Sequence, residues 1–367
     1  MQLSGSICPK ADFSLLLGSV KPHFHDLNNP ASKPSSDWPQ LCGIHAFRDE
    51  RKQTSMAQFL LPIIFVVLWS SAFVAGKAGV QHATPFAFLA VRFSIVALIF
   101  MAVVIGFWIW RKKDRTKAVN AKTIHAEASN EKNRSNDPVL QTALVGVLIH
   151  GAYLGSTFFA MANGLGAALA ALIVSTQPLL TTALAIFLFG EKPRLIQWFG
   201  IFIGFAGVIV VIFPSLGINA PVIAIMSCVF GLLAITAGTL LQKRIGSSIG
   251  LLKSNIIQAS AASLFFILLI ATVETPHITW NEPFLIALAW QVLAVSTGAY
   301  VILMILIKRD SVAATTSLLF LVPPVTAIIA FFIFGEPLTP VTISGFFMAS
   351  AGVYLVTRHS STPEKKG

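Results

Sequence analysis

The chain has 367 residues, of which 55% are hydrophobic and only 11% are charged, and its formal net charge is +11. Soluble globular domains carry about 25% charged residues, so this composition excludes a large soluble protein and indicates a membrane protein. A net charge of this sign can indicate a nucleic-acid partner, but the positions of the basic residues, given below, argue against one.

Residues 1–56 form a polar, proline-rich segment that lacks the apolar run of a signal peptide. Met56 is followed at once by the apolar sequence AQFLLPIIF, a natural start for a membrane protein. One hypothesis is that Met56 is the true initiator, and the alternative is that residues 1–56 are a disordered cytoplasmic tail. The intact mass of the purified protein distinguishes the two, since a species that begins at Met1 rules out the first.

Ten stretches of the remaining sequence are long and apolar enough to cross a membrane as helices, which takes about 20 residues each. They run roughly over 58–76, 85–109, 139–161, 167–189, 195–213, 220–241, 254–273, 284–307, 312–334 and 339–357. Most connectors are short, whereas the polar connector 110–138 is long, and we expect it to be a flexible cytoplasmic loop. We therefore predict an all-α integral membrane protein with ten transmembrane helices.

The basic residues gather on alternate connectors. With a cytoplasmic N-terminus, the inner connectors hold Arg111, Lys112, Lys113, Arg115, Lys117, Lys192, Arg194, Lys243, Arg244, Lys253, Lys308 and Arg309. The C-terminal end adds Arg358 and, in the tail 359–367, Lys365 and Lys366. The outer connectors hold none, apart from Lys77 at the end of the first span. Lys and Arg near spans mark the cytoplasmic side, so we expect both termini to be cytoplasmic. We also expect the membrane to be the inner (cell) membrane of a bacterium.

Two distant segments of the sequence match each other. FLFGE at 187–191 returns as FIFGE at 332–336, and a shift of 145 residues also superimposes the pairs Pro178–Pro323, Gly200–Gly345 and Gly207–Gly352. The pattern indicates a duplication with about five helices in each half, 57–213 and 218–358. Because an odd number of spans inverts the second copy, we predict two inverted five-helix repeats, an architecture typical of secondary transporters.

The motifs of several spans resemble those of a known family. LWSSAFVAGKAG in the first span, AVRFSI in the second, HGAYLGSTFFAM in the third and the two FGE segments are similar to EamA-type transporters of the drug/metabolite transporter (DMT) superfamily. The resemblance covers the chain from about residue 57 to residue 358. It implies ten helices, a central cavity between the halves, and transport of small metabolites, often efflux of amino acids or related compounds.

Two ionisable residues lie inside predicted spans. A charge within the membrane is energetically costly, so each of them is a candidate for a functional role. Arg92 lies about two turns into the second span, and its guanidinium could bind a substrate carboxylate or could pair structurally with helix-end carbonyls. His150 lies near the middle of the third span, where it could carry a coupling proton or could be a neutral, hydrogen-bonded side chain. Every Asp and Glu lies in a tail, in a loop or at the end of a span.

Three further charged residues mark the ends of spans. Lys77 ends the first span and could act in gating, although such a lysine commonly extends to the membrane interface. Glu191 and Glu336 each follow a glycine at a helix C-terminus, where the helix dipole disfavours a carboxylate, so each is expected to have a specific partner. They could bond backbone amides of the next helix in structural turns, or pair with Lys192, Arg194 or a neighbouring loop. The alternative is that they form gate contacts.

Uncharged polar residues in the spans could line a cavity or could hold helices together. The candidates for substrate binding are Trp69, Ser70, Ser71, Tyr153, Gln177 and Tyr300, in addition to Arg92. Glycines at 200, 204 and 207 allow close helix packing, and a homodimer through that face is an alternative use of them.

The leading interpretation is a secondary transporter that works by alternating access, with a small-molecule substrate and the lipid bilayer as its partners. A membrane-embedded enzyme usually needs paired acids, a metal cluster or a nucleophile–base pair, and the spans carry none of these. We therefore expect no enzyme activity, no metal, no cofactor and no nucleic-acid partner. A non-transporting membrane protein is disfavoured because an inverted repeat builds a two-sided site.

Overall fold

The computed structural model describes residues 47–115, 138–189, 194–213, 222–245, 250–309 and 318–360. The chain divides into two units, Met1–Arg51 and Lys52–Gly367, and the second contains the membrane-spanning helices. Most of the segment 1–56, most of the loop 110–138, Glu191 and most of the tail 359–367 lie outside the described residues, so the predictions made for them stay predictions.

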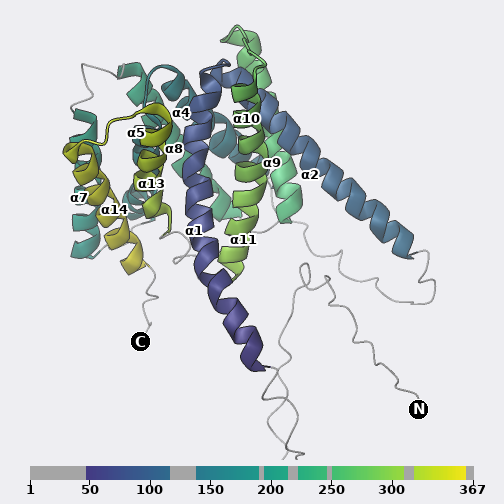
Figure 1. Ribbon diagram of the computed structural model, residues 1–367, viewed down its shortest axis with the longest axis horizontal. Helices are drawn as coiled ribbons and strands as arrows, with labels where there is room; N and C mark the ends of the chain where they lie inside the picture. Colours follow the sequence, from purple (N-terminus) through teal and green to yellow (C-terminus); the bar gives the residue numbers. More distant parts are fainter. Residues whose placement is uncertain are drawn as a thin grey trace, which may run out of the picture. The chain divides into compact units, whose positions relative to one another are not determined.

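The described residues form helices joined by short connectors and contain no β-strand, since Ala83 and Ile278 form only an isolated antiparallel bridge (Figure 1). The first half comprises α1 (Phe47–Val80), α2 (Pro85–Arg115), α3 (Pro138–Gly146), η2 (Val147–Ala152), α4 (Tyr153–Ala162), α5 (Ala167–Ser175), α6 (Gln177–Phe189) and α7 (Leu195–Ile212). The second half comprises α8 (Val222–Ile245), α9 (Leu251–Thr272), α10 (Glu282–Ala289), η4 (Trp290–Ala299), α11 (Tyr300–Arg309), η5 (Leu318–Leu321), α13 (Val322–Phe334) and α14 (Pro340–Ser360).

Nine helices in the described part of the chain are long and apolar enough to cross a membrane. The remaining predicted span, 312–334, corresponds to a shorter apolar helix over Leu318–Phe334, and its first residues lie outside the described ranges. The prediction of an all-helical integral membrane protein is therefore confirmed. Helices suit this environment because every backbone polar group is satisfied within the segment itself.

The outer surface of the bundle is apolar. Leu98, Phe202 and Phe347 are 65%, 74% and 73% exposed, and many other large apolar side chains on these helices are exposed too. Such exposure would favour aggregation in water, but lipid tails are as apolar as these side chains and solvate them without penalty. The exposed faces therefore mark the surface that contacts lipid.

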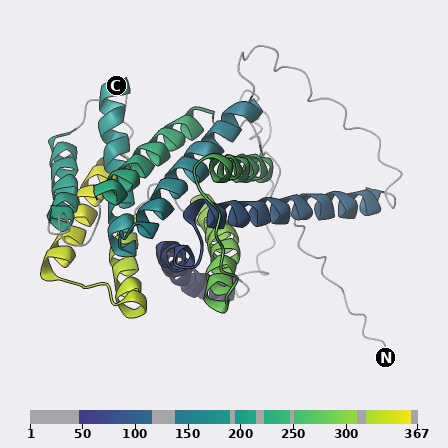
Figure 2. The ribbon, with the colours of Figure 1, turned by 90° about the horizontal axis from the view of Figure 1, so that it is seen from above.

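Glycines bring α7 and α14 into close contact, and the two helices lie side by side in Figures 1 and 2. A Cβ atom added at Gly352 would lie 2.5 Å from the backbone of Gly204 and from the carbonyl oxygen of Gly200. A Cβ atom added at Gly207 would likewise lie 2.7 Å from the carbonyl oxygen of Gly345. The glycine face of α7 is therefore covered by α14 of the same chain, and it is not the free surface that a homodimer would use.

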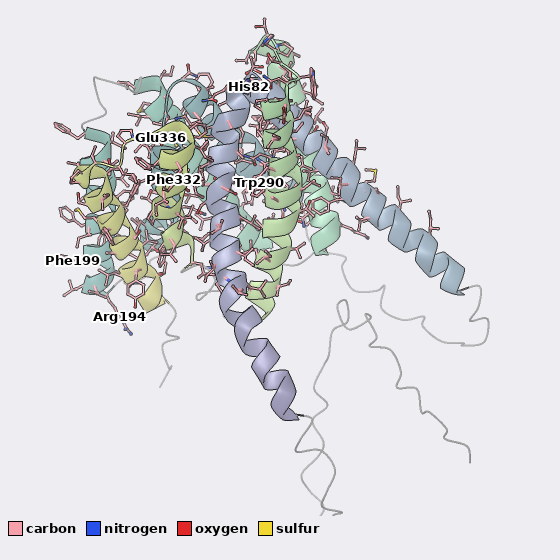
Figure 3. All side chains as sticks on the ribbon, in the orientation of Figure 1. His82, Arg194, Phe199, Trp290, Phe332 and Glu336 are labelled. Carbon is pink, nitrogen blue, oxygen red and sulfur yellow. The ribbon has the colours of Figure 1, made fainter. Side chains whose placement is uncertain are left out.

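One end of the bundle is held together by side chains that cap helices. The carboxylate of Glu274 accepts hydrogen bonds from the amides of Phe86 and Ala87 at the start of α2, at 3.2 and 3.0 Å. The side chain of Asn281 caps α10 by accepting from the amide of Phe284 at 3.0 Å, and it also bonds the ring of His82 at 3.0 Å. Figure 3 places His82 and Glu336 toward this end and Arg194 toward the other.

Candidate functional site

A cavity of about 250 Å³ lies within the bundle, lined by residues of α1, α2, η2, α4, α8, α9 and η4. Much of the lining is aromatic or aliphatic. The lining residues with polar atoms in their side chains are Trp69, Arg92, His150, Tyr153, Thr157, Thr239, Asn255, Gln291 and Ser296. Small-molecule sites are commonly apolar clefts of about 300–1,000 Å³ with a few placed polar groups, so this cavity lies just below that size range and has the chemistry of a site for a small metabolite.

Arg92 is the one charged residue among those that line the cavity, because the lining contains no Asp, Glu or Lys. Its side chain is buried, with 5% of the residue exposed. The hydroxyl oxygen of Ser296 accepts hydrogen bonds from Nε at 3.3 Å and from Nη2 at 3.0 Å, and the guanidinium lies 5.2 Å from the ring centre of Phe93. Within the described ranges no carboxylate pairs with it, since the single ion pair there is Lys77–Glu336. A buried, unneutralised guanidinium favours an anionic ligand.

Two π-helical segments contribute to the cavity wall. The segment η2 supplies Ile149 and His150, and η4 supplies Gln291, Val295 and Ser296. A π-helix pairs residues five apart through its hydrogen bonds, and such turns occur frequently at functional sites. The cavity is therefore bordered by irregular turns of two membrane-spanning helices, which lie in the third and eighth predicted spans.

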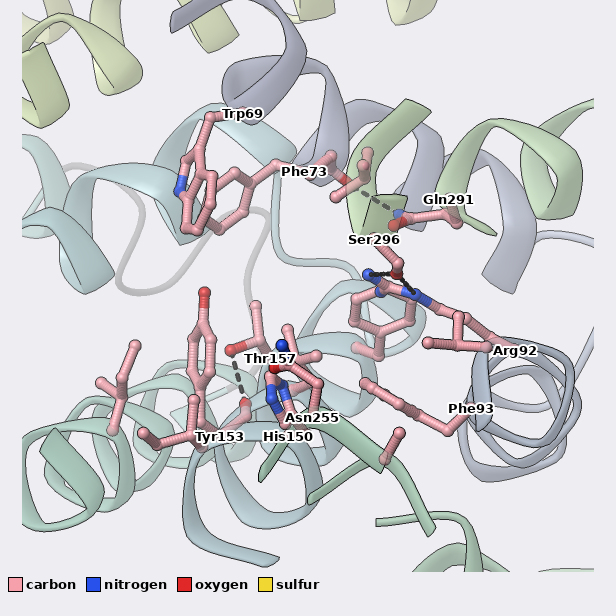
Figure 4. Close-up of a pocket in the computed structure, with 18 of the residues that line it drawn as sticks. Trp69, Phe73, Arg92, Phe93, His150, Tyr153, Thr157, Asn255, Gln291 and Ser296 are labelled. Atoms are coloured by element: carbon pink, nitrogen blue, oxygen red, sulfur yellow. Dashed lines mark hydrogen bonds between the residues drawn. The ribbon is translucent and has the colours of Figure 1, made fainter. Parts of the chain in front are cut away.

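The predicted residues Trp69, Arg92, His150 and Tyr153 come together around this cavity. The ring of His150 lies 5.3 Å from the ring of Phe93, centre to centre, and the ring of Trp69 lies 5.4 Å from that of Phe65. Figure 4 shows Arg92, Ser296 and Gln291 at one end of the cavity and Trp69 with Tyr153 at the other. The cavity thus has one polar, cationic end and one aromatic end.

Three other predicted residues lie outside the lining and join helices. The Ser70 hydroxyl donates to the carbonyl oxygen of Val322 at 3.2 Å, which ties α1 to α13. The Ser71 hydroxyl accepts from Nε1 of Trp290 at 2.8 Å, beside an apolar groove between α1, α10 and α13. The Gln177 amide donates to the Thr239 hydroxyl at 2.8 Å.

Tyr300, also predicted to bind substrate, begins α11, and its side chain lies outside the described part of the structure.

Lys77 and Glu336 meet at the end of the bundle where α5 begins. The Nζ atom of Lys77 lies 2.6 Å from Oε1 of Glu336, and the two residues have side-chain exposures of 19% and 16%. The same carboxylate accepts from the amides of Ala167 at 2.8 Å and Ala168 at 3.3 Å. Glu336 follows Gly335, whose φ of +67° is a left-handed conformation that suits glycine and turns the chain out of α13. The carboxylate expected to need a partner therefore has three.

Asn255 and Gln291 line the cavity but were not singled out from the sequence. Uncharged amides are tolerated in membrane helices more readily than charges, so they stand out less in a hydropathy profile. The sequence feature that could have identified them is an amide side chain within an otherwise apolar span. Whether such an amide lines a cavity depends on the face of the helix that it occupies. For Gln291 that face is set by the π-helical turn of η4.

Comparison with known proteins agrees with this architecture. Residues 56–213 match the EamA-like transporter family. A solved crystal structure that covers 84% of this chain and 99% of its own has a TM-score of 0.53 at 17% sequence identity, a likeness that shows the fold alone.

Three relatives are similar over most of the chain. An uncharacterized transporter of Bacillus subtilis (strain 168) is 23% identical over 303 residues, which is 82% of this chain and 92% of the relative. An uncharacterized inner membrane transporter of Escherichia coli (strain K12) is 25% identical over 79% of this chain and 87% of its own length. A protein of Salmonella typhimurium named a probable amino-acid metabolite efflux pump is 26% identical over 80% of this chain and 93% of its own length. The resemblance that the motifs carry is thereby confirmed.

Proposed function

Because this chain is similar to EamA-type membrane transporters over about four fifths of its length, we propose that it is a secondary transporter that exports small organic acids, amino acids or related compounds among them. The observation that carries this proposal is the cavity with a single charged lining residue, the buried Arg92. One relative is named for amino-acid metabolite efflux, which supports the direction of transport and the class of substrate.

The chemistry of the cavity supports an amphipathic substrate. A guanidinium in hydrocarbon is costly, so an arginine kept at this depth is expected to meet a ligand or a partner of opposite charge. Ser296 offers a neutral hydroxyl to two of its nitrogens, which orients the guanidinium without neutralising it. A substrate carboxylate would supply the missing charge, and the rings of Trp69 and Tyr153 would contact its apolar body.

Alternating access between two inverted repeats follows from the duplication, and the element boundaries support it. The helices α6 and α13 are each 13 residues long, begin 145 residues apart and carry a proline in second position, Pro178 and Pro323. Shifted by the same 145 residues, η2 falls on 292–297, inside η4. Each repeat would then contribute one π-helical turn to a site between the halves, around which the halves rock.

We propose gating roles for the charged residues at the helix ends. Lys77 and Glu336 join α1 to α13 at one end of the bundle, so opening that end requires this contact to break. Glu191 occupies the position equivalent to Glu336 under the 145-residue shift, and it is the candidate for a counterpart contact at the other end.

His150 is the candidate for proton coupling. It lines the cavity on η2, and the lining contains no carboxylate that could do this work. Of the titratable residues in the lining, histidine is the type that ordinarily changes charge between pH 5 and 8. Protonation of His150 would add a second positive charge to a cavity that already holds Arg92, and so would change its affinity for an anion.

The topology belongs to the same proposal. The basic connectors support cytoplasmic termini, and a relative in E. coli is named an inner membrane transporter. We therefore place the chain in a bacterial inner membrane with both termini in the cytoplasm.

Metabolite profiling tests the proposal. Cells expressing the parent chain, Arg92→Ala or Arg194→Ala are compared with empty-vector cells at matched membrane levels. Arg194 is an exposed arginine at the start of α7 that does not line the cavity, and it serves as the control. We expect a small set of amino acids or related acids to accumulate in the medium of the parent and of Arg194→Ala, and not in that of Arg92→Ala. Identical media from all four cultures would contradict export.

A further inference from the structure

Gln291 holds a hydrogen-bond acceptor that nothing in the described residues satisfies. The residue is fully buried, with 0% exposure, and it lines the cavity. Its Nε2 atom donates to the carbonyl oxygen of Ala72 at 2.7 Å, whereas its Oε1 atom is buried without a hydrogen-bond partner in the described part of the chain. Buried polar groups are nearly always paired, so an unpaired acceptor in a cavity wall requires an explanation.

The bond to Ala72 determines which amide atom is left unpaired. A backbone carbonyl oxygen can only accept, so the atom of Gln291 that faces it must be the NH₂ group. The amide oxygen is therefore the free atom, and a group that pairs with it has to be an N–H or O–H donor. A cation such as an ammonium group or a neutral hydroxyl would both satisfy this condition.

The free acceptor lies beside the cationic end of the cavity. Gln291 and Ser296 are five residues apart on η4, a spacing that puts both on one face of a π-helix. Ser296 in turn holds the guanidinium of Arg92. Figure 4 shows the three side chains together at that end. An anion-binding group and a donor-binding group are thus placed next to each other.

We propose that Gln291 is a specificity-determining residue whose Oε1 accepts a hydrogen bond from an amino or hydroxyl group carried next to the acid group of the substrate. The proposal rests on the proposed function, because it describes how the same cavity selects its substrate. It narrows the substrate class to α-amino and α-hydroxy acids with apolar bodies, and it disfavours plain carboxylic acids of the same size. A plain acid would leave the Gln291 oxygen buried and unpaired, which is the situation that gives polar sites their strongest discrimination.

The test uses the purified full chain in proteoliposomes and three probes of one size: phenylalanine, 3-phenyllactate and 3-phenylpropionate. The first two carry a donor beside the carboxylate and the third does not. The variants are Gln291→Met, which removes the acceptor, and Gln291→Glu, which keeps one. Gln197→Met is the control, because Gln197 is a buried glutamine of α7 outside the cavity lining.

We expect the parent chain and Gln197→Met to transport the two donor-bearing probes with an affinity at least about tenfold higher than that for 3-phenylpropionate. Gln291→Met should lose this preference through weaker transport of the donor-bearing probes, and Gln291→Glu should keep a preference for phenylalanine. Equal affinity of the parent for all three probes, or an unchanged preference in Gln291→Met, would overturn the role of Gln291 and leave the proposed function intact. Failure of the parent to transport any probe would instead contradict the proposed function for acids of this class. If Gln291→Met does not fold, the probe selectivity of the parent and of Gln291→Glu still tests the role of Gln291.

Discussion

The Nζ atom of Lys77, at the end of α1, lies 2.6 Å from Oε1 of Glu336, which follows α13. The same carboxylate caps the first two amides of α5, and Gly166 permits the approach, because a Cβ there would lie 2.9 Å from Oε2 of Glu336. One carboxylate thus connects three helices that are far apart in the sequence, and it does so at a single end of the bundle.

The unequal roles of the two partners give the first prediction. We expect Glu336→Gln to destabilise the protein more than Lys77→Gln does. Glu336→Gln removes the ion pair and also the charge-assisted bonds to two amides, a loss of about 1–3 kcal/mol. Lys77→Gln removes only a partly exposed ion pair, which is worth about 1 kcal/mol or less. Thermal unfolding in detergent measures the difference.

The exchanged pair, Lys77→Glu with Glu336→Lys, serves as the control. It restores opposite charges but places a lysine against the amides at the start of α5, where a positive charge is unfavourable. We expect its Tm to be no higher than that of Glu336→Gln. Recovery of the parent Tm would show that the ion pair, and not the cap on α5, carries the stability.

The contact between α7 and α14 gives a second prediction. Gly352→Ala should lower the Tm, because the added Cβ would meet the backbone of Gly204 at 2.5 Å and only a shift of the helices relieves it. Gly106→Ala is the matched control on α2, since a Cβ there meets nothing within 4 Å. Thermal unfolding of both variants in detergent makes the comparison, and equal values of Tm would contradict the packing described for α14.

The bonds between Arg92 and Ser296 give a third prediction. Ser296→Ala should raise the KM for transport by about tenfold with little change in the maximal rate, because the guanidinium loses both of the hydrogen bonds that orient it before substrate binds. Thr297→Ala is the control, since the neighbouring Thr297 hydroxyl donates to the carbonyl oxygen of Val292 at 3.1 Å. Initial rates over a range of substrate concentrations measure both constants. A KM like that of the parent would show that Ser296 does not position Arg92.

His150 gives a fourth prediction, concerning pH. If His150 carries the coupling proton, the transport rate of His150→Gln should no longer respond to a pH gradient between about pH 5.5 and 8. Histidine ordinarily changes charge in this range, and glutamine does not titrate. His277→Gln should respond like the parent, because His277 is exposed at the end of the bundle. Transport in proteoliposomes with an imposed gradient measures this response, and an unchanged response in His150→Gln would remove His150 from the coupling mechanism.

Much of this architecture could be predicted from the sequence because the bilayer imposes simple constraints. Apolar length predicts the spans, and the cost of a buried charge drew attention to Arg92 and His150, which both line the cavity. The duplication was predicted from pairs 145 residues apart, such as Pro178 and Pro323. In the structure these two prolines are the second residues of α6 and α13.

The remaining features depend on which face of a helix each residue occupies. Ser70 and Gln177 resembled cavity residues in the sequence, yet their side chains bond neighbouring helices. Gln291 lines the cavity on a π-helical turn, and hydropathy carries no signal for such a turn. Glu336 was expected to bond amides of the following helix, but it caps α5, a helix of the other half, through a contact that only the fold creates.

Substrate binding at Arg92 is tested most directly by uptake into proteoliposomes that hold the purified parent chain or Arg92→Gln at equal density and with equal thermal stability. Labelled amino acids are added outside vesicles preloaded with the same unlabelled compounds, and empty vesicles give the background. We expect saturable accumulation with the parent chain and only background with Arg92→Gln. Accumulation that is equal for the two chains, or absent with both, would contradict a carrier that binds its substrate at Arg92.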